Sequence, residues 1–193
     1  MLEFIRSRVT ASIDLKTSLL SEMAILGAVE RTVEGIVQAY KNNGKVLWCG
    51  NGGSAADAQH LAAELSGRFY YDRPPLNSDA LHVNTSYLTA VANDYSYDLI
   101  YSRLVEAMGR KGDVLIGLTT SGNSKNVIAA MEKAREIGML TVGFTGKSGG
   151  LLAGKVDLLI NIPSTDTPRI QECHMLLGHT ICELTEMKLF PRM

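Results

Sequence analysis

From Lys45 onward, short apolar runs alternate with amphipathic stretches, and this alternation limits the possible folds more than any other feature of the sequence. Repeated β–α alternation predicts an α/β fold: a three-layer sandwich with a mostly parallel five-stranded sheet and helices on both faces. The expected strands are residues 46–49, 80–83, 114–118, 140–144 and 158–162, and the expected helices are residues 55–65, 97–108, 125–137 and 169–189.

The first 43 residues are predicted to be helical, because apolar residues recur there at helical spacing. Gly27 is expected to interrupt this region and Gly44 to end it. The chain is therefore interpreted as a single domain, 1–193, with N-terminal helices in 1–43 and an α/β core in 44–193. Two helices before the first strand either cover the sheet or form an oligomer interface, and the sequence leaves both open.

Composition narrows the classes of function. A chain of 193 residues that is 46% hydrophobic suits one globular domain. Its 19 Lys and Arg residues balance 20 Asp and Glu residues, so neither a nucleic acid nor a membrane is an expected partner. Only three cysteines are present, and no signal peptide or run of about 18 apolar residues is visible. A cytoplasmic protein with reduced thiols is expected.

A glycine-rich loop follows the first expected strand, with the sequence Gly50-Asn51-Gly52-Gly53-Ser54. Glycines at a strand-to-helix turn let the backbone approach a ligand closely. Ser54 is expected to cap the next helix, with Asp57 completing a capping box. This loop alone does not distinguish a binding site from simple turn geometry.

A second loop, Thr119-Thr120-Ser121-Gly122-Asn123-Ser124, follows the third expected strand. Hydroxyl groups and free amides at a helix N-terminus favour a phosphate. The alternative is that Ser124 caps the helix while the other hydroxyls satisfy the loop backbone. Two such loops at strand ends favour the phosphate, and the similar segment 145–150 is interpreted as a turn.

Four polar residues on two helices are candidates for the chemistry. His60 and Glu64 lie about 40° apart around one expected helix, and Gln171 and His179 lie about 80° apart around another. If the helices face each other, the four side chains converge and either hold a metal such as zinc or form an acid–base pair. The other interpretation is that His179 is a core histidine, as His82 and His174 are expected to be.

These features resemble the phosphoheptose isomerases of the SIS-domain (sugar isomerase) class. Several separate motifs agree with that family in order and spacing. The matching stretches are CGNGGSAADAQHLAAELSGRF (49–69), AVANDY (90–95), GDVLIGLTTSGNS (112–124), GFTGKSGG (143–150) and IPSTDTPRIQECHMLLGH (162–179).

The resemblance implies an enzyme that converts sedoheptulose 7-phosphate to D-glycero-D-manno-heptose 7-phosphate, the first step of bacterial ADP- and GDP-heptose biosynthesis. It implies a homotetramer with active sites between subunits and one Zn²⁺ per subunit, held by His60, Glu64, Gln171 and His179. Glu64 and His179 match the catalytic pair. The implied substrate-binding residues are Asn51, Gly52, Gly53, Ser54, Glu64, Arg68, Asn93, Asp94, Thr119, Thr120, Ser121, Ser124 and Gln171.

Two non-enzymatic relatives provide the rival interpretations. One is a scaffold that binds the bacterial replication initiator, and its known examples lack the acidic and histidine pair that Glu64 and His179 supply here. The other is the sugar-phosphate sensor of a transcription regulator, which would need a DNA-binding module for which this chain leaves no room. The sequence does not indicate which of Glu64 and His179 would take the carbon proton.

Overall fold

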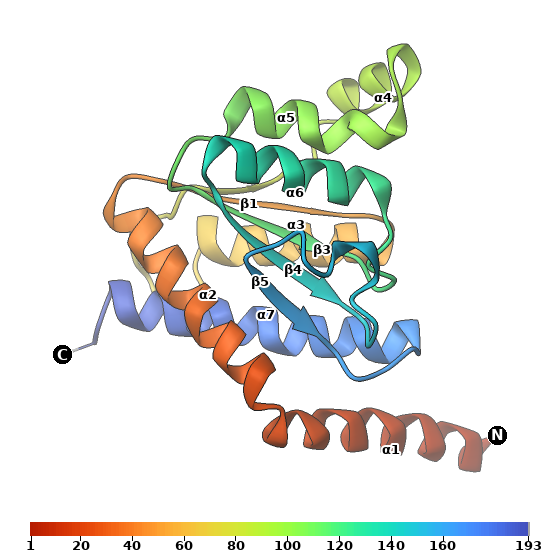
Figure 1. Ribbon diagram of the computed structural model, residues 1–193. Coiled ribbons are helices and arrows are strands. Elements are labelled where there is room, and N and C mark those ends of the chain that lie inside the picture. The colour runs from red at the N-terminus through yellow and green to blue at the C-terminus, as the bar shows by residue number, and fades with distance from the viewer. Residues whose placement is uncertain (193) are drawn as a thin grey trace.

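The protein is an α/β sandwich around one parallel sheet, seen in a computed structural model that describes residues 1–192 (Figure 1). The strand order is β2-β1-β3-β4-β5, and every neighbouring pair is parallel. Sequence analysis expected a mostly parallel five-stranded sheet, and this prediction is confirmed. The strands are β1 (Val46–Gly50), β2 (Ser78–Ala80), β3 (Val114–Leu118), β4 (Leu140–Thr145) and β5 (Leu158–Asn161).

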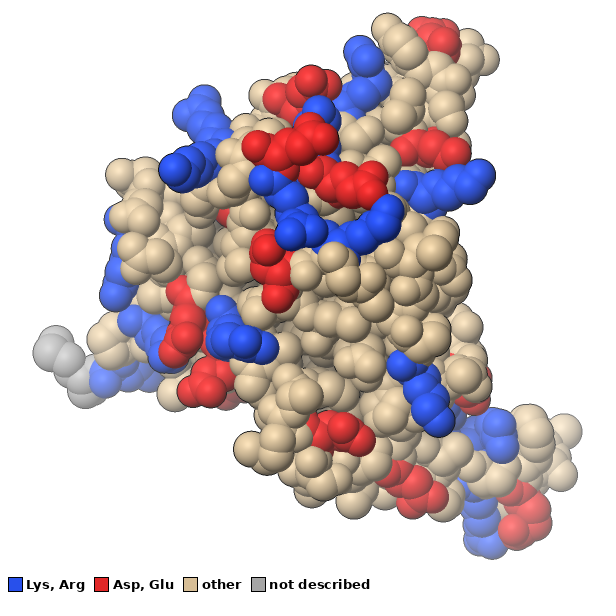
Figure 2. Space-filling model, in the orientation of Figure 1, with Lys and Arg blue, Asp and Glu red and all other residues tan. Residues whose placement is uncertain are grey.

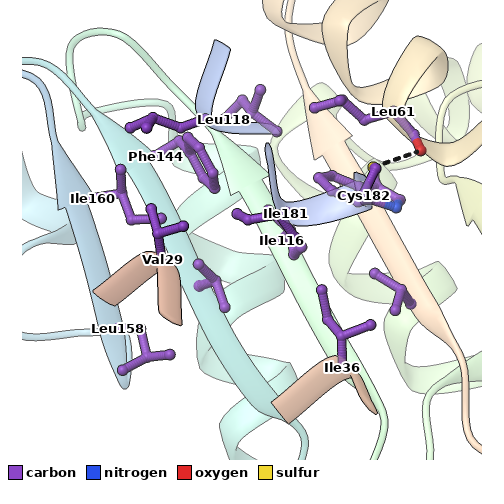
Figure 3. Close-up of a cluster of buried hydrophobic side chains, with 14 of the residues drawn as sticks. Val29, Ile36, Leu61, Ile116, Leu118, Phe144, Leu158, Ile160, Ile181 and Cys182 are labelled. Carbon is purple, nitrogen blue, oxygen red and sulfur yellow. Dashed lines mark hydrogen bonds between the residues drawn. The ribbon is translucent and has the colours of Figure 1, made fainter. Parts of the chain in front are cut away.

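Helices cover both faces of the sheet because side chains of each central strand alternate between two cores. One core contains Val46 and Trp48 and packs against α2 (Met23–Lys41), α3 (Gly53–Ser66) and α7 (Thr167–Leu189). Figure 3 shows part of this core, where Ile36 of α2 and Ile181 of α7 lie near Ile116 of β3. The opposite core packs against α5 (Ile100–Met108) and α6 (Lys125–Ile137).

The strand order creates a switch point between β1 and β3. From β1 the chain continues through α3 to β2 on one side, whereas from β3 it continues through α6 to β4 on the other. The helices that follow β1 and β3 therefore lie on opposite faces of the sheet. In open parallel sheets a ligand binds in the crevice at such a point, beyond the carboxyl ends of the strands.

The N-terminal region divides into two helices, but not where the sequence predicted. A 3₁₀ segment, Leu19–Ser21, and the non-helical Glu22 separate α1 (Leu2–Ser18) from α2. The expected interruption at Gly27 is wrong, because Gly27 lies inside α2. Burial of its neighbours Ile25, Ala28 and Val29 offsets the roughly 1 kcal/mol that a helical glycine costs.

The two N-terminal helices differ in how they pack. Helix α2 covers the sheet, whereas α1 buries none of its residues and lies on the outer side of α7 (Figure 1), where the Ser12 hydroxyl donates to Glu172. Five large apolar side chains of α1 are more than half exposed: Leu2, Phe4, Ile5, Val9 and Ile13. Packing over the sheet therefore accounts for α2 but not for α1.

Two expected elements differ from the structure, and one helix was not expected. The strand expected over residues 80–83 ends at Ala80, because the chain then turns and the N–H of Val83 donates to the Ala80 carbonyl. His82 therefore lies in that turn and not on a strand. A helix that the sequence analysis missed, α4 (Thr85–Asp94), begins where the Asn84 side chain accepts a bond from the N–H of Tyr87. The helix expected over 97–108 begins with a 3₁₀ turn, Tyr97–Leu99.

The surface carries both signs of charge. On the face drawn in Figure 2, Lys and Arg side chains are interspersed with Asp and Glu. Within residues 1–192, no helix combines the length and the apolar character needed to cross a bilayer.

Candidate active site

A hydroxyl-rich loop lies at the carboxyl end of β3, as the sequence predicted. Thr119 and Ser124 share a hydrogen bond with an Oγ1–Oγ distance of 2.9 Å, and the Ser121 hydroxyl accepts a bond from the N–H of Asn123. Ser124 occupies the N-cap of α6 but makes no side-chain capping bond, so its hydroxyl remains directed at the loop. Free N–H groups of the first turn of α6 are thus available to an anion.

Gly122 determines the path of this loop. Its φ of +69° lies in the left-handed region, and an added Cβ would lie 2.1 Å from the carbonyl oxygen of Gly149. Gly149 belongs to the segment after β4, interpreted from the sequence as a turn. Close approach of these two loops requires glycine at position 122.

The glycine-rich loop after β1 faces the hydroxyl loop across a cavity of about 280 Å³. Helix α3 begins at Gly53 with Gly52 at its N-cap, so Ser54 is a buried residue inside the helix. The predicted Ser54 cap and its capping box with Asp57 are wrong: Gly52, with a φ of +55°, makes the turn without a side-chain cap. The cavity is lined by Asn51, Gly53, Ser54, Leu118, Thr119, Thr120, Ser121, Ser124, Thr167 and Gln171.

The Asn51 amide joins the two loops. Its Nδ2 donates to Oδ1 of Asn126 at 2.9 Å, and its Oδ1 accepts from Nδ2 of Asn126 at 2.8 Å and from the Tyr97 hydroxyl at 3.1 Å. Asn126 is buried in the first turn of α6. The side chain of Asn51 is therefore committed to holding the loop after β1 against α6.

Three of the four candidate catalytic or metal-binding residues converge about two turns along α3 and α7 from the residues that line this cavity. Nε2 of His60 lies 3.0 Å from Nε2 of His179 and 3.2 Å from Oε1 of Glu64. One ligand atom from each of these residues lies within 4.8 Å of the others. Burial lowers the pKa of the His179 imidazole, His60 lowers it further, and Glu64 opposes both. His179 is thus biased towards its neutral form, which can accept a proton or bind a metal.

Gln171 lies two turns before His179 on α7 and lines the hydroxyl-rich cavity. The helices α3 and α7 approach closely at this point, since a Cβ on Gly53 would lie 2.6 Å from Nε2 of Gln171. The two helices also approach closely two turns further along α7, where a Cβ on Gly178 would lie 2.5 Å from Cδ1 of Leu61. Small residues at both positions let the two helices bring their polar side chains together.

The donor set fits a zinc ion. Two imidazole nitrogens and one carboxylate oxygen are ligands that zinc takes in catalytic sites, and such sites keep a further position for substrate or water. The same three groups also suit proton transfer between adjacent oxygens and carbons of a sugar. The arrangement serves either chemistry.

A family model described as SIS domain matches residues 15–146. Phosphoheptose isomerase from Clostridium acetobutylicum is 50% identical over 190 residues, which cover 98% of this chain and 97% of that protein. The chain belongs to the SIS-domain family of phosphoheptose isomerases. The solved structure of phosphoheptose isomerase GmhA from Neisseria gonorrhoeae aligns with a TM-score of 0.89 at 42% identity, covering 96% of this chain and 98% of that chain. A phosphoheptose isomerase from Francisella tularensis aligns with a TM-score of 0.92 at 35% identity, with the same coverage.

This membership confirms the resemblance and the fold class predicted from the sequence. Within the phosphoheptose isomerase fold, three predicted site residues lie apart from the cavity in this single chain. Arg68 is exposed in the segment after α3, while Asn93 and Asp94 end α4, where Nδ2 of Asn93 donates to Oδ1 of Asp94 at 2.9 Å. Their contribution to a site stays a prediction.

The sequence analysis did not identify several residues that support the site of this phosphoheptose isomerase family member. Asn126 and Tyr97 hold Asn51, and the only signal for Asn126 was its place two residues after the hydroxyl loop. Arg73 and Glu186 form a buried ion pair between the C-terminal end of α3 and the C-terminal half of α7. His174, in contrast, is the buried core residue that was expected, with Nε2 bonded to the Thr145 carbonyl at 3.1 Å.

Proposed function

We propose that this protein isomerises sedoheptulose 7-phosphate to D-glycero-D-manno-heptose 7-phosphate through an enediol or enediolate. The observation that carries the proposal is the convergence of His60, Glu64 and His179 about two helical turns, along α3 and α7, from a cavity lined with hydroxyls. Membership of the phosphoheptose isomerase family supports the same reaction. The reaction would begin the supply of activated heptose, as the first step of ADP- or GDP-heptose biosynthesis.

Phosphate binding is proposed for the loop after β3. Thr119, Thr120, Ser121 and Ser124 supply hydroxyls, and the N-terminal amides of α6 add donors and a favourable dipole. With a net charge of −1, the chain offers no general attraction to an anion, so these local donors would carry the affinity. Anchoring the phosphate would hold the far end of the sugar near the histidine and glutamate cluster.

Proton transfer is proposed for Glu64 and His179. Isomerisation requires removal of a proton from the carbon beside a carbonyl, its return to the neighbouring carbon, and movement of protons between the two oxygens. The carboxyl group of Glu64 and the imidazole of His179 lie within 4.8 Å of each other, so both can exchange protons with the same part of a sugar. The lowered pKa of His179 keeps it available as a proton acceptor at physiological pH.

Zinc is proposed to be held by His60, Glu64, Gln171 and His179, one ion per subunit. When bound, it would supply Lewis-acid polarisation of the sugar carbonyl. Gln171 would contribute its amide oxygen from the edge of the cavity that it shares with the hydroxyl loop.

A homotetramer is proposed as the working assembly. The chain exposes 9768 Å², more than the roughly 9,000 Å² expected for a compact monomer of this length. The apolar side chains Leu2, Phe4, Ile5, Val9 and Ile13 of α1 are more than half exposed and would gain cover in an assembly. A site between subunits would also give Arg68, Asn93 and Asp94 a place beside the substrate.

A cytoplasmic location is proposed because Cys49, Cys173 and Cys182 are free thiols.

The rival is a non-catalytic scaffold of the same fold that binds the replication initiator. A scaffold has no need for two imidazoles and a carboxylate within contact distance, which favours the enzyme. The deciding experiment is incubation of the purified protein with sedoheptulose 7-phosphate in D₂O, with and without added Zn²⁺. The aldose should accumulate and carry deuterium at carbon 2, as read by NMR. An absence of turnover under both conditions would end the enzyme proposal.

A further inference from the structure

The segment that follows α3, residues 67–73, crosses from the end of α3 to the C-terminal half of α7; we call it the strap. It carries Arg68 and Phe69, and the Phe69 ring lies 5.7 Å from the His179 ring, centroid to centroid. It has no helix or strand structure of its own. Contacts at its far end therefore decide where it lies.

Arg73 ends the strap, and its guanidinium binds the last carbonyl groups of α3. Nη2 donates to the Glu64 carbonyl at 2.8 Å, and Nη1 donates to the Leu65 carbonyl at 2.7 Å and the Gly67 carbonyl at 3.0 Å. Helix ends leave such carbonyls without intrahelical partners. A side chain eight or nine residues away in sequence thus satisfies them and fixes the backbone that carries Glu64.

Glu186 holds the strap from the other side. Its Oε1 accepts bonds from the Phe69 N–H and from Nε of Arg73, both at 3.0 Å, and its Oε2 accepts a bond from the Tyr70 N–H at 2.8 Å. Burial alone would raise the pKa of this carboxyl, but the two backbone donors and Arg73 outweigh it and lower the pKa. The carboxylate therefore stays charged and fully bonded with its side chain only 1% exposed.

The ion pair lies about two turns along α7 from His179. Glu186 follows His179 by seven residues, which places both within about 20° on one face of α7. On α3, Arg73 binds the backbone of Glu64 itself. Arg73 and Glu186 thus connect the helix of one catalytic candidate to the helix of the other.

Building on the proposed function, we propose that Arg73 and Glu186 are positioning residues, which set the separation of Glu64 and His179 and seat Phe69 against the His179 ring. Buried ion pairs add little net stability compared with apolar residues of similar size. A need for geometry therefore explains this pair better than a need for stability. Neither residue would touch the substrate.

The test is Glu186→Gln, compared with Asp113→Asn as a matched control. Gln would present Nε2 to one of the backbone N–H groups of Phe69 or Tyr70, donor against donor, and release the strap. Asp113 is a buried carboxylate with the same kind of partners, namely the N–H groups of Lys45 and Arg110 and the ammonium of Lys45. It lies directly before β3, at the amino ends of the strands, whereas the site lies beyond their carboxyl ends.

Glu186→Gln should lower kcat roughly 10- to 100-fold, while Kd for inorganic phosphate stays within about threefold because the hydroxyl loop is untouched. Asp113→Asn should lower Tm by a comparable amount and keep kcat within about twofold. Equal loss of kcat in both variants, or an unchanged kcat in Glu186→Gln, would overturn the inference. If Glu186→Gln does not fold, Arg73→Lys replaces it, since lysine keeps the charge but cannot reach three carbonyls and a carboxylate together.

Crystal structures of the parent and of both variants give a readout that needs no turnover. The Phe69 and His179 rings should separate in the strap variant and stay in contact in Asp113→Asn. Rings that remain in place in the strap variant would refute positioning even if kcat falls. A parent without isomerase activity would refute the proposed reaction, and the ring positions alone would then decide this inference.

Discussion

Nε2 of His60 and Nε2 of His179 lie 3.0 Å apart, although 119 residues separate them in the sequence. At this distance two neutral imidazoles share one proton, or both lone pairs point at a cation. Glu64 completes the group from the same helix as His60, one turn later. The three side chains therefore act as a unit, and removing any one should change the protonation or metal binding of the other two.

Glu64→Gln and His179→Gln should each lower kcat by roughly 10²–10⁴, the usual contribution of a general acid or base. Both replacements stay polar and similar in size, so circular dichroism and assembly state should match the parent. The measurement is turnover of sedoheptulose 7-phosphate. Glu132→Gln, which removes an exposed carboxylate paired with Lys155, is the control and should keep its full rate. Normal turnover in Glu64→Gln would remove this residue from the mechanism.

Gly122→Ala should weaken phosphate binding at least tenfold, as expected if one charge-assisted hydrogen bond worth about 1.5–3 kcal/mol is lost. The new Cβ would meet the backbone of Gly149, so the loop must move. Gly154→Ala is the control, since Gly154 also has a positive φ, +82°, but has open space around it. It should lower stability by roughly 1–2 kcal/mol and leave affinity unchanged. Calorimetry with inorganic phosphate compares the two, and equal affinities would place the phosphate elsewhere.

Dialysis against a strong chelator should lower activity, and added Zn²⁺ should restore it. His60→Ala should lower the zinc content measured by elemental analysis, because it removes one of the two imidazoles proposed as ligands. His174→Gln is the matched control, since His174 also lies on α7 but is bonded to the Thr145 carbonyl. Full activity in protein shown to be free of metal would leave the cluster as an acid–base site alone.

The pH dependence of stability should include a contribution from His174. Burial lowers the pKa of its imidazole to about 4, against an ordinary value of 6.5. Between these values the unfolded chain binds more protons than the folded chain, so the free energy of unfolding rises with pH. The stability present above pH 6.5 should fall by about 3 kcal/mol as the pH drops to about 4. Denaturant titrations should show a flatter pH profile in His174→Gln, and an unchanged profile would contradict this assignment.

The sequence predicted the central elements well, because their apolar periodicity reflects burial. The strand Val114–Leu118 and the helix Lys125–Ile137 have the expected bounds, and both are enclosed by other elements. Helix α4 was missed because its Thr, Ser and Val residues have weak helix propensity and only Val91 is buried. The sequence analysis placed the helix break at Gly27 and not at Glu22. Glycine often interrupts helices, but packing decides whether a given helix continues through it.

The site was predictable wherever a motif is continuous along the chain. The hydroxyl loop and the spacing of His60 and Glu64 were visible directly. Convergence with His179 depends on how α3 and α7 cross. Gly53 and Gly178 allow the two helices to approach closely, but the sequence does not show that these glycines face the other helix. The roles of Arg73 and Asn126 could not be predicted because their partners lie 113 and 75 residues away, respectively.

The switch in strand order between β1 and β3 has a consequence for substrate length. The loop proposed for the phosphate leads into α6 on one face of the sheet, whereas the residues proposed for proton transfer lie on α3 and α7 on the other. In the proposed site, a bound sugar would reach from the phosphate loop to Glu64 and His179, past the carboxyl ends of β1 and β3. The fixed distance between these two layers would then select sugars by the number of carbons between their phosphate and their carbonyl. Shorter sugar phosphates would bind through the same ester group and still leave their carbonyl out of register with the catalytic pair.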